Sequence, residues 1–85
     1  MEKIFIEVKC PAISESFEFR ISKKLSVGDG LKKIVSEIRL FCGNDEIFPD
    51  EDHVELFSDR INGVLNRTMS FSENGVRSGD QLMIL

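Results

Sequence analysis

The chain has 85 residues, of which 41% are hydrophobic, and its formal net charge is −4 at pH 7. A chain of this length forms one domain, residues 1–85, with a small core, and its acidic balance argues against a nucleic-acid-binding protein. No apolar run is long enough for a transmembrane helix, and the first residues enter a strand pattern directly, so neither membrane insertion nor a signal peptide is predicted.

The first predicted elements are two strands that form a hairpin. Residues 3–9 and residues 17–21 alternate between apolar and polar side chains, which is the periodicity of a strand with one buried face. The residues between the two runs include Pro11 and Ser14, so the connection is longer than a two-residue turn. The side chains expected on the buried face are Ile4, Ile6, Val8, Phe17, Phe19 and Ile21.

The next element is a helix that starts near Val27. Ser26 is a suitable N-cap, Asp29 follows three residues later, and Gly43 is placed to end the helix. Gly28 and Gly30 weaken the first turn. The apolar residues follow the three- and four-residue spacing of a single helical stripe, and they are Val27, Leu31, Ile34, Val35, Ile38 and Phe41. A helix with one apolar stripe needs a surface to cover, and the sheet is the available one.

An acidic loop, residues 44–52, separates this helix from the second half of the chain. Residues 54–57 alternate and predict a third strand. Asn62-Gly63 is the pair most favoured for a tight two-residue hairpin turn, and residues 64–65 would form a short fourth strand after it.

The last third of the chain combines a turn-rich stretch with a final strand. Residues 69–76 contain two apolar anchors, Phe71 and Val76, and residues 82–85 alternate as a strand. The resulting order is strand, strand, helix, strand, short strand, strand. It predicts an α+β fold of the ubiquitin-like β-grasp type, in which one helix packs across a mixed sheet of four to five strands.

The ending MSFSENGVRSGDQLMIL, residues 69–85, resembles the ending of ubiquitin-type proteins. Residues 71–73 match its apolar-Ser-acid turn, Gly75-Val76 its apolar anchor, and Gly79-Asp80 the corner before its last strand. The whole chain resembles the YukD/EsaB family, which are small ubiquitin-like proteins of the type VII secretion systems of Gram-positive bacteria. Its length, its helix over residues 27–38 and its ending carry this resemblance.

The resemblance implies a cytoplasmic, non-catalytic accessory or regulatory component of such a secretion system. The implied partner is a protein, either the secretion ATPase or a membrane component of the machinery, and a homodimer is a second arrangement. Proteins that are conjugated or that carry sulfur need a flexible Gly-Gly ending, whereas this sequence finishes on Met83-Ile84-Leu85. We therefore expect neither chemistry. A generic ubiquitin-like adaptor that is unrelated to secretion is the alternative.

The sequence contains no residue pattern that predicts an enzyme, a cofactor site or a metal site. His53 is the only histidine and is expected to be a solvated loop residue. The carboxylates of residues 44–52 lack the spacing of a calcium loop, which favours a solvated face. Cys10 and Cys42 form no Cys-x-x-Cys pair, so reduced thiols that pack as small apolar side chains are expected.

The candidate functional residues lie on the opposite face of the sheet. Alternation places Phe5, Met83 and Leu85 outward, and Phe57 joins them if residues 54 and 56 point inward. In a β-grasp sheet the first and last strands are central neighbours and the third strand flanks the last, so these four residues are expected to adjoin. We predict a surface for binding a partner protein, with a polar rim formed by Glu7, Glu18, Arg20 and Glu55.

Overall fold

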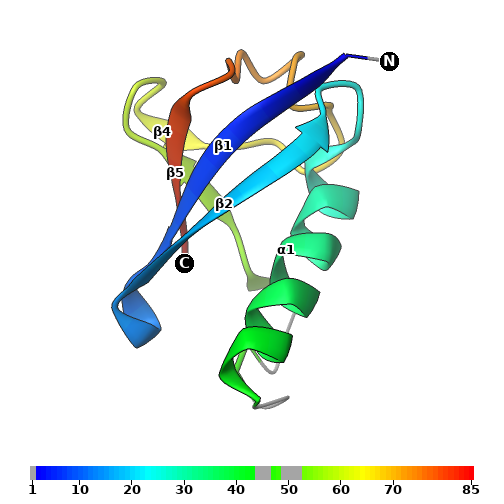
Figure 1. The fold of residues 1–85 in the computed structure, drawn as a ribbon. Coiled ribbons are helices and arrows are strands. Elements are labelled where there is room, and N and C mark those ends of the chain that lie inside the picture. The colour runs from blue at the N-terminus through cyan, green and yellow to red at the C-terminus, as the bar shows by residue number, and fades with distance from the viewer. Residues whose placement is uncertain (1, 44–46, 49–52) are drawn as a thin grey trace.

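The computed structural model describes residues 2–43, 47–48 and 53–85. Within them, a five-stranded sheet of order β2-β1-β5-β3-β4 carries one helix, α1, across one of its faces (Figure 1). Strand β1 is parallel to β5 and antiparallel to β2, and β3 is antiparallel to both β5 and β4. The predicted mixed sheet with one helix is confirmed. The elements are β1 Lys3–Cys10, η1 Pro11–Ile13, β2 Glu15–Ser22, α1 Val27–Cys42, β3 Leu56–Ser58, β4 Gly63–Val64 and β5 Asp80–Ile84.

Both ends of α1 are capped as the sequence predicts. The Ser26 hydroxyl accepts a hydrogen bond from the Asp29 N–H at 3.2 Å, and Gly43 takes the left-handed conformation with φ of 62°. The stripe from Val27 to Ile38 is buried against the sheet. Phe41 departs from this stripe, because 63% of its surface is exposed at the last turn of the helix.

The core lies between α1 and the inward residues of the sheet. The apolar inward residues of β1 and β5 are buried, and they include Ile6, Val8, Leu82 and Ile84. Phe71, from the turn-rich stretch, is fully buried and packs on Gly30 of α1. A Cβ atom on Gly30 would lie 2.5 Å from the Cε2 atom of Phe71, so the ring occupies the space that any larger residue would need.

The connection between β3 and β4 differs from the predicted two-residue turn. Ser58 pairs with Gly63, so the loop comprises residues 59–62 and Gly63 belongs to β4. Asn62 adopts the left-handed conformation with φ of 61°, and its N–H donates to the Ser58 carbonyl at 2.8 Å. Asparagine tolerates this conformation, so the Asn-Gly pair ends a longer turn here instead of forming the whole of a short one.

The remaining strand boundaries shift slightly from the prediction. Strand β3 covers Leu56–Ser58 and β5 begins at Asp80. The solvated carboxylate face predicted for residues 44–52 falls mostly on residues 44–46 and 49–52, which lie outside the described residues. No helix among the described residues has the length and apolarity to cross a membrane.

Candidate protein-binding face of the sheet

The face of the sheet that points away from α1 carries a group of adjacent apolar side chains. Phe57 pairs with Met83 on one side and with Val64 on the other, so the three lie side by side on β5, β3 and β4. Leu85 belongs to the next row, where its N–H donates to the Glu55 carbonyl at 2.9 Å. We call Phe57, Val64, Met83 and Leu85 the apolar patch. Half or more of the surface of Val64 and Leu85 is exposed, and Phe57 and Met83 are half-buried.

Phe5 is outward and exposed, as predicted, but it does not adjoin the other three predicted residues. The β1 residue beside Met83 is Lys9, whereas Phe5 lies beside Gly79, whose N–H donates to the Phe5 carbonyl at 2.7 Å. Four residues of strand, about 13 Å, separate these two positions. The expectation that all four residues adjoin is therefore wrong for Phe5. The prediction used the fact that the strands are adjacent but not their register. Which residues of β1 and β5 lie side by side depends on the offset between the two strands.

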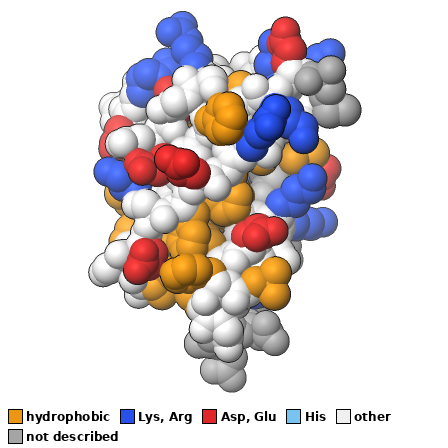
Figure 2. Space-filling model, in the orientation of Figure 1, with side chains coloured by type: hydrophobic (Ala, Val, Ile, Leu, Met, Phe, Trp, Pro, Cys, Tyr) orange, Lys and Arg blue, Asp and Glu red, His pale blue; other side chains and the backbone are white. Residues whose placement is uncertain are grey.

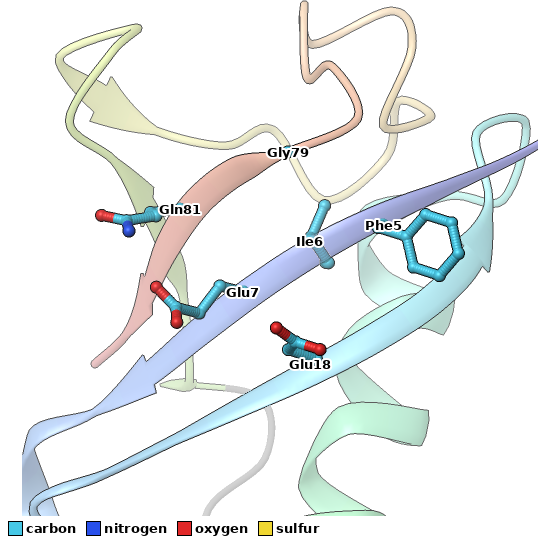
Figure 3. A pocket seen from close by; sticks show the side chains of 6 residues that line it. All are labelled: Phe5, Ile6, Glu7, Glu18, Gly79 and Gln81. Atoms are coloured by element: carbon cyan, nitrogen blue, oxygen red, sulfur yellow. The ribbon is translucent and has the colours of Figure 1, made fainter.

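An acidic row separates Phe5 from the apolar patch. Glu7 of β1 pairs directly with Glu18 of β2, and Gln81 lies beside Glu7 on β5. These three residues line a shallow depression together with Phe5 and Gly79, and Figure 3 shows the two carboxylates over neighbouring strands with the Phe5 ring beyond them. Directly opposed like charges disfavour the sheet. Glu7 and Glu18, which the sequence predicts as rim residues, therefore lie between Phe5 and the apolar patch, Glu7 on β1 and Glu18 on the edge strand β2.

Arg20 and Gly79 shape the end of the face around Phe5. The Arg20 guanidinium lies 5.6 Å from the centre of the Phe5 ring, within the range of a cation–π contact. Gly79 has φ of 93°, a conformation that favours glycine, and it leaves the depression open because it carries no side chain. The Phe5 N–H donates to the Ser78 hydroxyl at 3.0 Å, so the turn before β5 fixes this end of β1.

An ion pair holds the start of β5 in place. Arg60 binds both carboxylate oxygens of Asp80, at 3.0 Å from Nε and 2.8 Å from Nη2, and it also donates to the Gly75 carbonyl. The Arg77 N–H donates to the same carboxylate at 2.9 Å. The hydrogen bond from Arg60, followed by that from Arg77, holds the pKa of Asp80 below its usual range. The ion pair of Arg60 with Asp80 therefore has a structural role, because it anchors the predicted Gly79-Asp80 corner.

The described residues contain no group of His, Cys, Asp and Glu side chains arranged to hold a metal ion. His53 is exposed. Cys10 and Cys42 are both free thiols, and burial raises the pKa of the Cys10 thiol, which makes it a poor nucleophile at neutral pH. The outer face presents exposed apolar and acidic side chains.

Solved structures with the same arrangement of elements show which fold this is. The structure superposes on ubiquitin from Caldiarchaeum subterraneum with a TM-score of 0.74 and 17% sequence identity, over 98% of this chain and 91% of that one. The fold is ubiquitin-like. The ubiquitin-like domain of Plasmodium falciparum Dsk2 gives a TM-score of 0.75 at 14% identity, over 98% of this chain and 96% of the other.

A bacterial domain shares the fold equally well. The ubiquitin-like domain of EccD5 from Mycobacterium xenopi gives a TM-score of 0.76 at 8% identity, over 100% of this chain and 94% of that one. No protein-family model and no curated protein sequence matches the chain. At these identities the comparisons establish the fold, and the residues of the outer face must carry any argument about function.

Sequence reasoning missed one member of the apolar patch. Val64 was expected in a short strand, but its face was not assigned, because a two-residue strand offers no alternation to read. The pairing of Phe57 with Val64 settles that face. The sequence offers one signal for this face, because Val64 and Leu65 are two apolar residues in a row directly after the turn glycine Gly63. If Leu65 is buried, alternation places Val64 on the outer face.

Proposed function

We propose that this protein is a non-catalytic ubiquitin-like binding module whose apolar patch contacts a partner protein. The observation that carries the proposal is the continuity of the patch across three adjacent strands. Single exposed apolar residues are ordinary on protein surfaces, but here the paired positions Val64, Phe57 and Met83 are all apolar. Contiguous apolar surface rimmed by polar residues is typical of interaction sites.

The setting that we propose is the cytoplasmic side of a type VII secretion system of Gram-positive bacteria. The resemblance to the YukD/EsaB family over the length of the chain supports it. The similar fold of a mycobacterial ubiquitin-like domain is in keeping with a bacterial setting. The partner in this proposal is the secretion ATPase or a membrane component of the same machinery, and the protein acts there as an accessory or regulatory subunit.

The test compares two variants in a binding experiment with the cytoplasmic domains of the secretion ATPase. Val64→Lys combined with Met83→Lys places two charges in the apolar patch, whereas Leu40→Lys alters an exposed apolar residue on α1, 75% of whose surface is accessible. Loss of one buried apolar contact costs about 1.5–3 kcal/mol, so the patch variant should bind at least about tenfold more weakly by calorimetry. The control variant should bind as the parent does.

Two outcomes would contradict parts of the proposal. Equal binding by the patch variant and the parent would show that the apolar patch is ordinary surface. Failure of the parent to bind any component of the secretion machinery would remove the proposed setting while leaving the binding module to be tested with other partners. Light scattering gives the molar mass of the parent and of the patch variant in solution. A dimeric parent and a monomeric patch variant would show that the partner is a second copy of the chain. Circular dichroism verifies that both variants fold.

A further inference from the structure

A second depression lies at the edge of the sheet, where β2 ends and the chain turns into α1. Its volume is about 380 Å³, and β1, β2, the turn after β2, and α1 all contribute to its walls. Figure 2 shows Lys and Arg side chains gathered towards the upper right of this face, where β2 ends and α1 begins in Figure 1. We call this depression the basic pocket, and its main lining residues are Lys3, Arg20, Ile21, Lys24, Leu25 and Lys33.

The charges of the basic pocket are not neutralised by the described part of the protein. Among the described residues, no carboxylate lies within ion-pair distance of any of its four cations. Lys23, the neighbour of Lys24, differs in this respect, because it pairs with Glu2. Like charges held around one depression repel one another, so an anion bound between them would relieve this repulsion.

An aromatic ring, not an acid, holds Arg20 at the rim of the basic pocket. The Arg20 guanidinium lies 5.6 Å from the centre of the Phe5 ring. A cation–π contact of this kind fixes the position of the guanidinium, but it leaves the charge and the N–H donors available to a ligand.

The carboxylates that are closest along β2 and α1 lie outside the lining of the pocket. Glu18 and Glu37 line the adjoining groove, and Asp29 lies one turn before Lys33 in the first turn of α1. None of the three pairs with a cation of the pocket. With four cations against these three carboxylates, the region is net positive, although the whole chain carries −4.

We propose that the basic pocket binds the phosphate group of a phosphorylated serine or threonine in a partner protein. A phosphate monoester carries almost two negative charges at neutral pH and three acceptor oxygens, and basic clusters recognise such groups. The cations come from four segments around one depression, which suits one compact dianion better than carboxylates spread along a chain. Ile21 and Leu25 provide an apolar wall for the residues beside the phosphorylated one.

The exposure and charge of the pocket favour a protein as the source of the phosphate. Exposed charges are screened by salt, so a free phosphate ion would bind weakly, whereas a phosphorylated protein adds contacts around the phosphate. An anionic membrane or a nucleic acid extends beyond the pocket and would meet the net charge of −4. A single phosphorylated side chain meets the local positive charge alone.

The basic pocket is separate from the apolar patch. It lies at the β2 edge of the sheet, whereas the apolar patch involves β3, β4 and β5 on the other side of β1. The inference therefore goes beyond the proposed function, and each of the two sites can be tested without the other.

The probes are three pools of short labelled peptides with mixed uncharged flanks and a central phosphoserine, serine or glutamate. Fluorescence anisotropy with the full chain should show saturable binding of the phosphoserine pool. Binding of the glutamate pool should be at least about tenfold weaker, because glutamate has one charge and two acceptor oxygens. The serine pool should not bind.

Two variants with the same net charge locate the site. Lys24→Gln with Lys33→Gln removes two cations of the pocket, and Lys9→Gln with Lys32→Gln removes two exposed lysines that do not line it. The first variant should bind the phosphoserine pool about tenfold more weakly, and the second should bind it as the parent does. In NMR spectra of the parent, the Cε–Hε resonances of Lys24 and Lys33 should shift on binding, and those of Lys32 should not.

Four results would overturn the inference. Absence of saturable binding by the phosphoserine pool, or equal binding by the glutamate pool, would show that the pocket does not select phosphate. Equal loss of binding in the two variants would mean that general charge, not the pocket, attracts the peptide. Sedimentation of the parent with phosphatidylglycerol vesicles that the phosphoserine pool does not reverse would make a membrane surface the occupant.

Discussion

Replacement of Gly30 by alanine should destabilise the protein, although alanine is the better helix former. Gly30 lies in the first turn of α1 and has ordinary helical geometry, so intrinsic propensity favours alanine by at most about 1 kcal/mol. A methyl group at this position would lie 2.5 Å from Cε2 and 2.6 Å from Cζ of Phe71. Carbon atoms in contact are normally about 3.5–4.0 Å apart, so the overlap is about 1 Å.

The buried ring has little freedom to avoid this overlap. Phe71 is 0% exposed, and overpacking a close-packed core costs about 1–3 kcal/mol. With the upper end of this range and the gain in propensity set against it, Gly30→Ala should lower the free energy of unfolding by about 2 kcal/mol. For a domain of this size, that corresponds to a fall in Tm of about 8–16 °C.

The assay is thermal and urea unfolding of the parent, the two single variants and Gly30→Ala combined with Phe71→Leu. The smaller leucine removes the ring atoms that the methyl group would meet, so Gly30→Ala should be neutral or slightly stabilising in that background. The double-mutant cycle then gives the coupling between the two positions. A Gly30→Ala protein as stable as the parent would refute the reasoning, because the ring would then move at no cost.

Two further predictions concern strand β5. Deletion of residues 82–85 removes Leu82 and Ile84, each 1% exposed. Loss of each buried side chain lowers the free energy of unfolding by about 2–5 kcal/mol, so circular dichroism should show an unfolded chain. An unchanged Tm would contradict this. Arg60 lowers the pKa of Asp80 in the folded state, so ionised Asp80 stabilises the fold. This stabilisation is fully present above the ordinary aspartate pKa of about 3.9 and is lost as the pH falls through the lower pKa of the folded state. Asp80→Asn should therefore flatten the loss of stability in acid, and an equally steep acid limb in urea titrations would count against the ion pair.

Local patterns were sufficient to predict most elements of the fold. The alternation of β1 and β2, the spacing of the stripe from Val27 to Ile38 and the caps Ser26 and Gly43 are all properties of neighbouring residues, and each is confirmed. The β3–β4 turn was predicted wrongly because Asn62-Gly63 is compatible with two turns of different length, and the pairing of Ser58 with Gly63 decides between them.

The candidate site was predicted less completely than the fold. Alternation correctly sent Phe5 and Met83 outward, but the distance between them depends on the offset between β1 and β5, which pair as parallel strands far apart in the sequence. No local signal contains that offset. The spacing of Phe41 matches the buried stripe, but this residue lies in the last turn of α1, where its ring packs on Phe17 and 63% of its surface is exposed.

The central position of β5 determines the order in which the molecule can fold. Residues 80–84 lie between β1 and β3 in the sheet, although most of the chain precedes them. During synthesis, the β1–β2 hairpin and α1 can form early, but their shared apolar surface stays open until these last strand residues leave the ribosome. Contacts between segments this far apart in the chain slow folding, so the nascent protein should depend on protection from aggregation until β5 is inserted.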